Sequence, residues 1–223
     1  MSEPSIYEDL AVLSAAVALR IADLAKEAIS ARGVFHFAVA GGGTPRRCYE
    51  YLRELPLDWA RVQLYFGDER CLPVGDAERN DSMVYDALIK HIAIPSANVH
   101  AISAERGALP AAAEYCAVME QAGRLDLILL GLGEDGHTAS LFPDNPATES
   151  SLSVVAVFNA PKPPSERVSL GMATINQARH KLFLVAGSGK REPLTRIAEG
   201  ELLPAAQVTD AEWYMDLAAG NQA

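Results

Sequence analysis

The stretch LDLILLGLGEDGHTASLFP, residues 125–143, joins an apolar run of strand length to a strongly polar turn. A short, almost continuously apolar run such as LDLILL is typical of a strand buried in a parallel sheet. The turn after it brings together carboxylate, imidazole and hydroxyl side chains: Glu134, Asp135, His137, Thr138 and Ser140. Because burying such groups unpaired is costly, we expect them to face water or a ligand.

Outward from this stretch, short apolar runs alternate with helical patterns along the chain. The pattern predicts helices over 7–31, 41–54, 80–92, 110–122, 172–178 and 191–199. Strands are expected at 34–40, 62–66, 98–102, 125–130, 153–158, 166–171, 181–187 and 212–216. This alternation indicates a single α/β domain spanning residues 1–223, with a mainly parallel central sheet flanked by helices on both faces.

Composition narrows the class of function. The formal net charge of −10 argues against a nucleic-acid partner, and no apolar run is long enough to predict a membrane partner. Three cysteines without CxxC spacing favour neither a disulfide framework nor a zinc knuckle. The N-terminal stretch MSEPSIYEDL carries acidic residues where a signal peptide carries basic ones, which predicts a cytoplasmic location.

The loops that follow the strands are the candidate binding loops, because ligands of open α/β sheets bind beyond the carboxyl ends of the strands. After the strand at 34–40 come three glycines, 41–43, and then Thr44 and Pro45. Thr44 is expected to be the N-cap of the next helix and Pro45 its first residue. The free N–H groups of that helix start would suit an anion, although a well-capped tight turn explains the same pattern.

Basic residues adjoin three of these strand ends. Arg70 and Lys190 follow strands, and Arg167 lies between a proline-rich loop and a strand. Each alone is typical of a solvated surface charge, but together with the glycine loop they could surround one phosphate. The dinucleotide motif GxGxxG fails for lack of glycine at position 46, and a Walker loop ending at Lys190 fails for lack of glycine at position 184.

His137 is the histidine best placed for chemistry, since it lies in the polar turn directly beyond a buried strand. An imidazole can accept and return a proton near neutral pH, and Asp135 could orient it. A hydrogen-bonded turn without chemistry is the simpler alternative. A metal site made with Asp135 and Asp68 has no supporting ligand spacing, and no G-x-S-x-G elbow indicates a serine nucleophile. We expect packed or surface roles for His36, His91, His100 and His180.

Six motifs resemble the 6-phosphogluconolactonase family of bacteria and eukaryotes. They are AVAGGGTPRRCYEYL (38–52), YFGDERCLP (65–73), NDSMVYDALI (80–89), LDLILLGLGEDGHTASLFP (125–143), APKPPSERVSLGMATI (160–175) and VAGSGKRE (185–192). The wider superfamily includes glucosamine-6-phosphate deaminase, which shares the glycine loop and the DGH turn. The deaminase pattern places a glutamate five residues after its turn histidine, where this chain has Phe142. The resemblance is therefore to the lactonase.

This resemblance implies a Rossmann-like, glucosamine-6-phosphate deaminase-like fold and hydrolysis of 6-phospho-D-glucono-1,5-lactone to 6-phosphogluconate, a step of the oxidative pentose phosphate pathway. It implies no metal and no organic cofactor. The family pattern assigns phosphate binding to Gly42, Gly43, Thr44, Arg167 and Lys190. It assigns catalysis to His137 with Asp135 and Arg70, and leaves Asp68 and Gly136 as further pocket candidates.

From the chemistry of these groups, His137 is expected to take a proton from the attacking water and return it to the ring oxygen. Two alternatives stay open: a sugar-phosphate deaminase or isomerase, and a non-catalytic sugar-phosphate binding module. A monomer or weak homodimer is expected, and solvent exposure is the simpler expectation for Arg46, Arg47 and Arg191.

Overall fold

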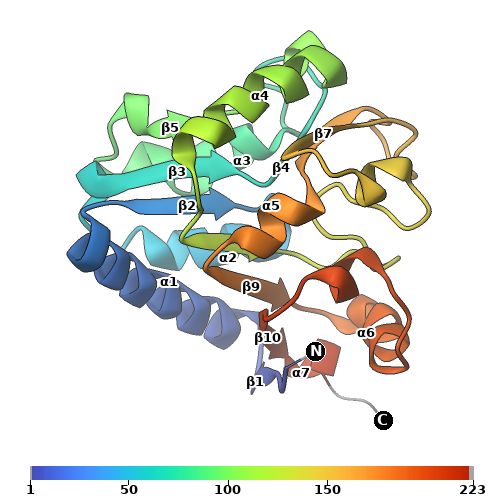
Figure 1. Cartoon of the computed structure of the whole chain (residues 1–223). Coiled ribbons are helices and arrows are strands. Elements are labelled where there is room, and N and C mark those ends of the chain that lie inside the picture. The colour runs from blue at the N-terminus through green and yellow to red at the C-terminus, as the bar shows by residue number, and fades with distance from the viewer. Residues whose placement is uncertain (1, 221–223) are drawn as a thin grey trace.

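A seven-stranded sheet, all of whose strand pairs are parallel, forms the centre of the molecule in the computed structural model, which describes residues 2–220 (Figure 1). Its strands run in the order β1-β10-β9-β6-β2-β3-β5. Their bounds are β1 Ser5–Tyr7, β2 Phe35–Val39, β3 Val62–Phe66, β5 Val99–His100, β6 Leu127–Leu130, β9 His180–Val185 and β10 Glu212–Asp216. The mainly parallel sheet expected from the sequence is confirmed.

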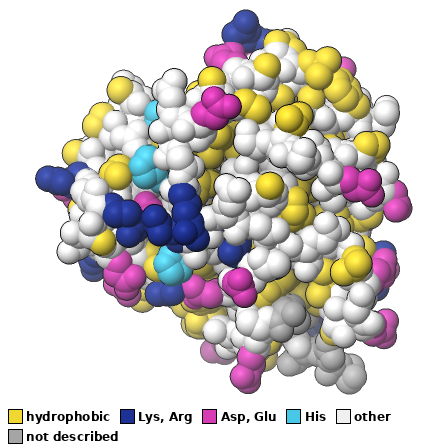
Figure 2. Space-filling model, in the orientation of Figure 1, with side chains coloured by type: hydrophobic (Ala, Val, Ile, Leu, Met, Phe, Trp, Pro, Cys, Tyr) yellow, Lys and Arg dark blue, Asp and Glu magenta, His cyan; other side chains and the backbone are white. Residues whose placement is uncertain are grey.

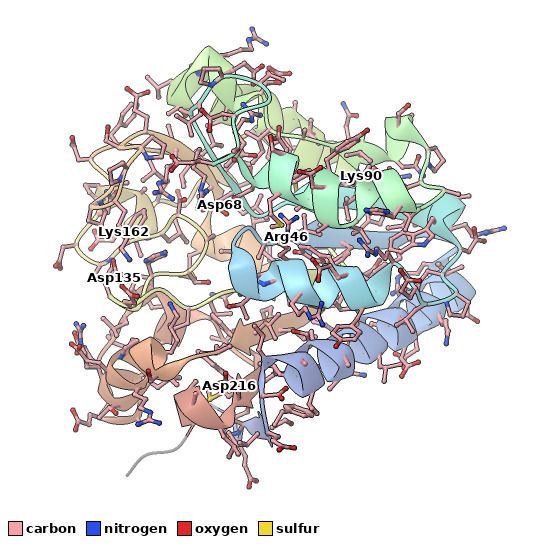
Figure 3. All side chains as sticks on the ribbon, turned by 180° about the vertical axis from the view of Figure 1, so that it is seen from behind. Arg46, Asp68, Lys90, Asp135, Lys162 and Asp216 are labelled. Atoms are coloured by element: carbon pink, nitrogen blue, oxygen red, sulfur yellow. The ribbon has the colours of Figure 1, made fainter. Side chains whose placement is uncertain are left out.

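Helices cover both faces of this sheet. Helices α1, α2 and α3 pack side by side on one face (Figure 3), and α4 and α5 lie on the other (Figure 1). The helices are α1 Leu10–Arg32, α2 Gly43–Leu52, α3 Asn80–Ala87, α4 Ala108–Ala122, α5 Met172–Gln177, α6 Arg191–Ala198 and α7 Leu217–Gly220. This division follows from right-handed crossovers, because connections that step through the sheet in opposite directions place their helices on opposite faces.

A smaller antiparallel sheet adjoins the large one, with strand order β4-β8-β7. It consists of β4 Asp68–Arg70, β8 Arg167–Leu170 and β7 Val154–Val157. The sequence predicts strands for β7 and β8 without separating them from the main sheet, and residues 68–70 were expected to be a loop. In the structure the backbone of β4 pairs with β8, placing Arg70 directly opposite Arg167.

Two predicted helix starts are wrong, each for a local reason. The first helix begins at Leu10 rather than at residue 7, because Tyr7 pairs with β10 and the Asp9 side chain accepts N–H bonds from residues 11 and 12. The second begins at Gly43, with Gly42 as its N-cap at φ 104°. Thr44, expected to be the N-cap, therefore lies inside the first turn together with Pro45.

The hydrophobic core takes residues from both sheets and from the helices around them. All four residues of β6 are buried, and α1 buries Leu13, Val17 and Ile21 at helical spacing. Phe183 of β9 stacks on Trp213 of β10 with ring centroids 3.9 Å apart. Among residues 2–220, no helix combines the length and the apolar character needed to cross a bilayer.

The chain reverses its direction of travel through the sheet between the neighbouring strands β2 and β6. From β2 it continues to β3 and β5, whereas from β6 it continues to β9 and β10 on the other side. A crevice forms at the carboxyl ends of two such strands, where ligands of this fold class bind. The glycine loop follows β2 and the histidine turn follows β6, so both predicted site loops meet at this crevice.

Candidate active site

A cavity of about 340 Å³ lies at this crevice, and the two sheets supply its walls together. It is lined by Gly41 beyond β2, His137 beyond β6, Lys190 beyond β9, and by Arg70 and Arg167 from the small sheet. Asp68, a further sequence-predicted candidate, also lines it. The structure thus brings the predicted imidazole and the predicted basic residues to one cavity.

The His137 imidazole is paired with the carboxylate of Asp135. Nδ1 of His137 lies 2.5 Å from Oδ1 of Asp135, which also accepts the backbone N–H of His137 at 3.2 Å. Burial alone raises the pKa of Asp135, but the hydrogen bond and charge of His137 outweigh burial and lower that pKa to about 2. An ionised carboxylate only accepts hydrogen bonds, so Nδ1 carries a proton and Nε2 is the ring nitrogen that Asp135 leaves unengaged.

The imidazole is held in place from two further sides. Its ring packs on the buried ring of Phe142, with centroids 4.5 Å apart. The imidazole also lies against Gly133, where a Cβ atom would stand only 2.0 Å from Nδ1 of His137. Glycine at this position therefore leaves the space that the imidazole occupies.

A network of buried polar groups forms the wall of the cavity between β4 and α3. Asp68 accepts hydrogen bonds from Ser140 Oγ at 2.5 Å and from Asn80 Nδ2 at 3.0 Å. The Asn80 side chain lies over Gly41, where any Cβ atom would overlap it. Glycine is therefore required at position 41, because the Asn80 side chain occupies the space that a Cβ atom would need.

Glu69, fully buried between Asp68 and Arg70, holds this wall together. Its carboxylate accepts the backbone N–H groups of Asn80 at 2.7 Å, Asp81 at 2.8 Å and Arg70 at 2.8 Å, which caps α3 from a distant strand. Burial raises the pKa of Glu69 to about 7, although these three hydrogen bonds oppose the increase. The side chain is thus a structural partner of α3 directly behind the cavity.

Arg70 and Arg167 face each other across the β4–β8 ladder. Like charges directly opposite one another destabilise a sheet unless an anion lies between them. Burial lowers the pKa of Arg167, and the nearby charge of Arg70 adds to this effect. Nη1 of Arg70 donates to the carbonyl of Glu78, whereas its buried Nε has no partner within residues 2–220. Two guanidinium groups that line one cavity suit this pair to an anionic ligand.

Lys190 extends the positive wall from the large sheet. It ends the 3₁₀ turn Ser188–Lys190, whose preceding residue Gly187 has φ 93° and donates its N–H to Asp216 at 3.0 Å. Asp216 also accepts the N–H of Ala219 at 2.8 Å, which fixes this turn to the end of β10. Burial lowers the pKa of Lys190, and among the described residues its Nζ has no protein acceptor.

The remaining predicted phosphate ligands lie beside the cavity and do not line it. Gly42, Gly43 and Thr44 form the start of α2, directly after Gly41. Gly136, at φ 86°, packs against Leu203 and shapes the turn that carries His137.

Arg46, Arg47 and Arg191 do not line the cavity, as expected. Arg47 pairs with Glu50 at 2.8 Å, and Arg46 lies 3.7 Å from the same carboxylate. Arg191 donates to the carbonyl of Ala218 at 2.7 Å.

Sequence reasoning missed two polar residues that line the cavity, Asn80 and Lys162, and expected of Glu134 only that it faces water or a ligand. The sequence places Asn80 only at the start of the helix expected over 80–92, and Lys162 lies in the proline-rich loop 160–164. The signal that could have found Lys162 is its position in a rigid, proline-bounded loop five residues before Arg167. Glu134 was seen in the polar turn, but nothing in the turn singled it out as a partner for that lysine.

Two other hollows lack the features of this site. One, of about 610 Å³ beside α3 and β5, is largely apolar and contains Asp81 and Asp86 but no basic side chain. The other lies at the opposite edge of the large sheet and contains Arg32, Arg124 and Arg179. These arginines are at helix C-termini, whose carbonyl ends favour cations.

Figure 2 shows Lys and Arg side chains gathered beside histidines on the face that it presents.

The residues weighed as a metal site do not form one. Within residues 2–220 no group of three His, Cys, Asp or Glu side chains is arranged to hold a metal ion. Asp68 is instead bonded to Ser140 and Asn80, and Asp135 to His137.

Comparisons with known proteins match the sequence and the fold of this chain. The family model described as glucosamine-6-phosphate isomerases/6-phosphogluconolactonase matches residues 8–215. The 6-phosphogluconolactonase of Mycobacterium tuberculosis is 36% identical over 214 residues, covering 89% of this chain and 87% of the relative. The crystal structure of the Thermotoga maritima 6-phosphogluconolactonase superposes with a TM-score of 0.88 at 27% identity, over 95% of this chain and 97% of that one.

A monomeric glucosamine-6-phosphate deaminase has the same fold, with a TM-score of 0.85 at 23% identity over 97% of this chain and 98% of that one. The fold alone therefore does not separate the two activities, and the side chains must. The chain belongs to the family of glucosamine-6-phosphate isomerases and 6-phosphogluconolactonases.

Proposed function

We propose that this protein hydrolyses 6-phospho-D-glucono-1,5-lactone to 6-phospho-D-gluconate, the activity named for its lactonase relatives. The observation that carries the proposal is the cavity itself, where an oriented imidazole faces a wall of arginine and lysine side chains. A sugar-phosphate lactone has the matching chemistry: a dianionic phosphate at one end and an electrophilic carbonyl carbon at the other.

The phosphate is assigned to the basic side of the site. Lys190 supplies a point charge and Arg167 contributes one edge of its guanidinium. The α2 start at Gly42, Gly43 and Thr44 lies beside the cavity, directly after the lining residue Gly41, and its dipole favours an anion there. These contacts would hold the lactone ring so that C1 lies near His137.

His137 acts as general base and then as general acid. Its Nε2 accepts a proton from water as the water oxygen bonds to C1, and C1 becomes tetrahedral with negative charge on the former carbonyl oxygen. As the C1–ring oxygen bond breaks, the imidazolium returns the proton to the departing ring oxygen, which becomes a hydroxyl. The new carboxylic acid then loses one proton to solvent.

Asp135 and Arg70 support the two charged species of this reaction. The Asp135 carboxylate stabilises the imidazolium and fixes the proton on Nδ1, so that Nε2 faces the substrate. Arg70 lines the cavity, so its guanidinium can donate to the oxyanion. Asp68 and Gly136 act less directly, through the Asn80 wall and through the backbone of the histidine turn. The reaction balances with water alone, so the proposal includes no metal or organic cofactor.

The deaminase alternative is disfavoured by Phe142. The ring of this residue is buried against the imidazole, so the position of the deaminase glutamate offers no carboxylate. A pure binding module is disfavoured because the His137–Asp135 pair would then have no role at the cavity.

The test is acid release from freshly prepared 6-phosphogluconolactone, measured above the spontaneous rate. We expect the wild-type chain to accelerate it and His137→Asn to lower kcat by roughly 10²- to 10⁴-fold with unchanged circular dichroism. Ammonia release from glucosamine 6-phosphate would instead support the deaminase. Binding of 6-phosphogluconate without acceleration would support the binding module.

A monomer or weak homodimer, a single domain over 1–223 and a cytoplasmic location stay predictions. Sedimentation of the purified chain tests the first of these, and limited proteolysis tests the second.

A further inference from the structure

Most of the hydrogen-bonding capacity of Arg167 is used within the protein. Its Nε donates to the carbonyl of Pro164 at 3.2 Å, and its Nη2 to the carbonyls of Lys162 and Pro163 at 3.0 Å each. The residue is only 5% exposed, and its guanidinium lies 5.5 Å from the centroid of the Phe142 ring. One buried guanidinium therefore fixes three successive carbonyls of the proline-rich loop.

This loop lines the cavity with Lys162 and Pro163, and Lys162 carries a charge. Figure 3 shows Lys162 on the same side of the molecule as Asp135 and Asp68, and Lys162 lines the cavity together with Lys190. The charge of Lys162 contributes to the lowered pKa of Lys190, after the larger effect of burial. Two ammonium groups held near each other in this way favour a doubly charged anion between them.

In the structure Lys162 is paired with Glu134, at 3.3 Å between Nζ and Oε2. The side chains of this pair are 51% and 65% exposed, and exposed ion pairs contribute little stability. Glu134 belongs to the histidine turn, so the pair bridges the loops on either side of the cavity. A phosphate dianion offers more charge and more acceptor oxygens than this carboxylate, so it can replace Glu134 as the partner of Lys162.

We propose that Lys162 is a further phosphate-binding residue of this site, positioned by Arg167 and released from Glu134 when substrate binds. The inference rests on the proposed lactonase function. Lys162 acts on the charged end of the substrate and not on the carbonyl carbon, so its contribution depends on the phosphate group.

The experiment compares two substrates, 6-phosphogluconolactone and unphosphorylated gluconolactone, in Lys162→Met. We expect kcat/KM for the phosphorylated lactone to fall about 10-fold, the lower end for a charged hydrogen bond because the side chain is half exposed. The rate with gluconolactone should be unchanged. The matched control is Lys90→Met, since Lys90 is similarly exposed at 42% and paired with Asp86 but lies away from the cavity (Figure 3).

Glu134→Gln is the second variant, and the proposal predicts its sign. Removing the competing carboxylate should lower KM for the phosphorylated lactone two- to fivefold, roughly the effect of losing a weak exposed ion pair. An unchanged kcat/KM in Lys162→Met, an equal loss with both substrates, or a raised KM in Glu134→Gln would overturn the proposal. If the wild-type chain opens neither lactone, the proposed function itself fails, which is a distinguishable result.

Discussion

Adding a single methyl group at Gly133 should displace the imidazole of His137 and so prevent its action as a base, while His137 itself is unchanged. A Cβ atom there would stand 2.0 Å from Nδ1, 2.3 Å from Cε1 and 2.6 Å from Cγ of His137, whereas ordinary contact begins at 3.4 Å. The imidazole must therefore shift by more than 1 Å, which breaks its 2.5 Å hydrogen bond to Asp135. Displacement of a reacting group by about 1 Å costs roughly 10²-fold in rate, and loss of general base catalysis roughly 10²- to 10⁴-fold.

We therefore expect Gly133→Ala to lower kcat for 6-phosphogluconolactone by about 10²- to 10³-fold. The fold should survive, because Gly133 lacks a positive φ. At such a position alanine stabilises a protein by about 0.4–1 kcal/mol, because it reduces the conformational entropy of the unfolded chain. Steady-state acid release and thermal unfolding of the same preparation separate the two effects.

The matched control is Gly131→Ala in the same loop, where an added Cβ atom meets no protein atom within 4 Å; because Gly131 also lines the cavity, the comparison uses kcat and not KM. This variant should keep kcat within a few-fold of the wild type. A Gly133→Ala enzyme with wild-type kcat would refute the reasoning, because it would show that the observed imidazole position is not needed for turnover.

Two further predictions concern the wall behind the cavity. Gly41→Ala should destabilise the protein by about 1–3 kcal/mol in urea unfolding, because its Cβ atom would lie 1.8 Å from Oδ1 of Asn80; an unchanged urea midpoint would contradict this. The second prediction concerns Glu69, whose pKa in the folded protein is raised to about 7. The folded protein therefore binds this proton more tightly than the unfolded chain does. The free energy of unfolding should fall by about 3 kcal/mol as pH rises from about 4.5 to 7. Glu69→Gln should remove this part of the pH dependence, and parallel stability curves for the two proteins would contradict the assignment.

The elements that the sequence predicts well are those whose own residues decide their structure. The buried strands β2, β3, β6 and β9 lie within two residues of their expected bounds, because short apolar runs flanked by glycine or polar turns have few alternatives. The strands β1 and β4 were missed because each is three residues long and is defined by a partner far away in the chain. No local pattern marks such a pairing.

The features of the site can be divided in the same way, into residues that local sequence predicts and contacts that depend on distant segments. His137, Arg70, Arg167 and Lys190 follow or flank strands, so the rule that ligands bind at carboxyl strand ends finds them. That rule cannot show how the donor groups of each side chain are used. No sequence pattern indicates that Nε and Nη2 of Arg167 donate to loop carbonyls. Nor does any pattern indicate that Asn80 fills the space over Gly41, because this contact joins segments that are distant in the chain.

The pairing of Arg70 with Arg167 sets a rule for which length changes the chain can tolerate. Successive residues of a strand point to opposite faces, so deleting one residue inside 68–70 or 167–170 would turn a guanidinium away from the pocket. The loop just before β8 is restricted as well, because Arg167 donates to the carbonyls of Lys162, Pro163 and Pro164. Relatives of this chain should therefore show no gaps within the two strands or within residues 162–166.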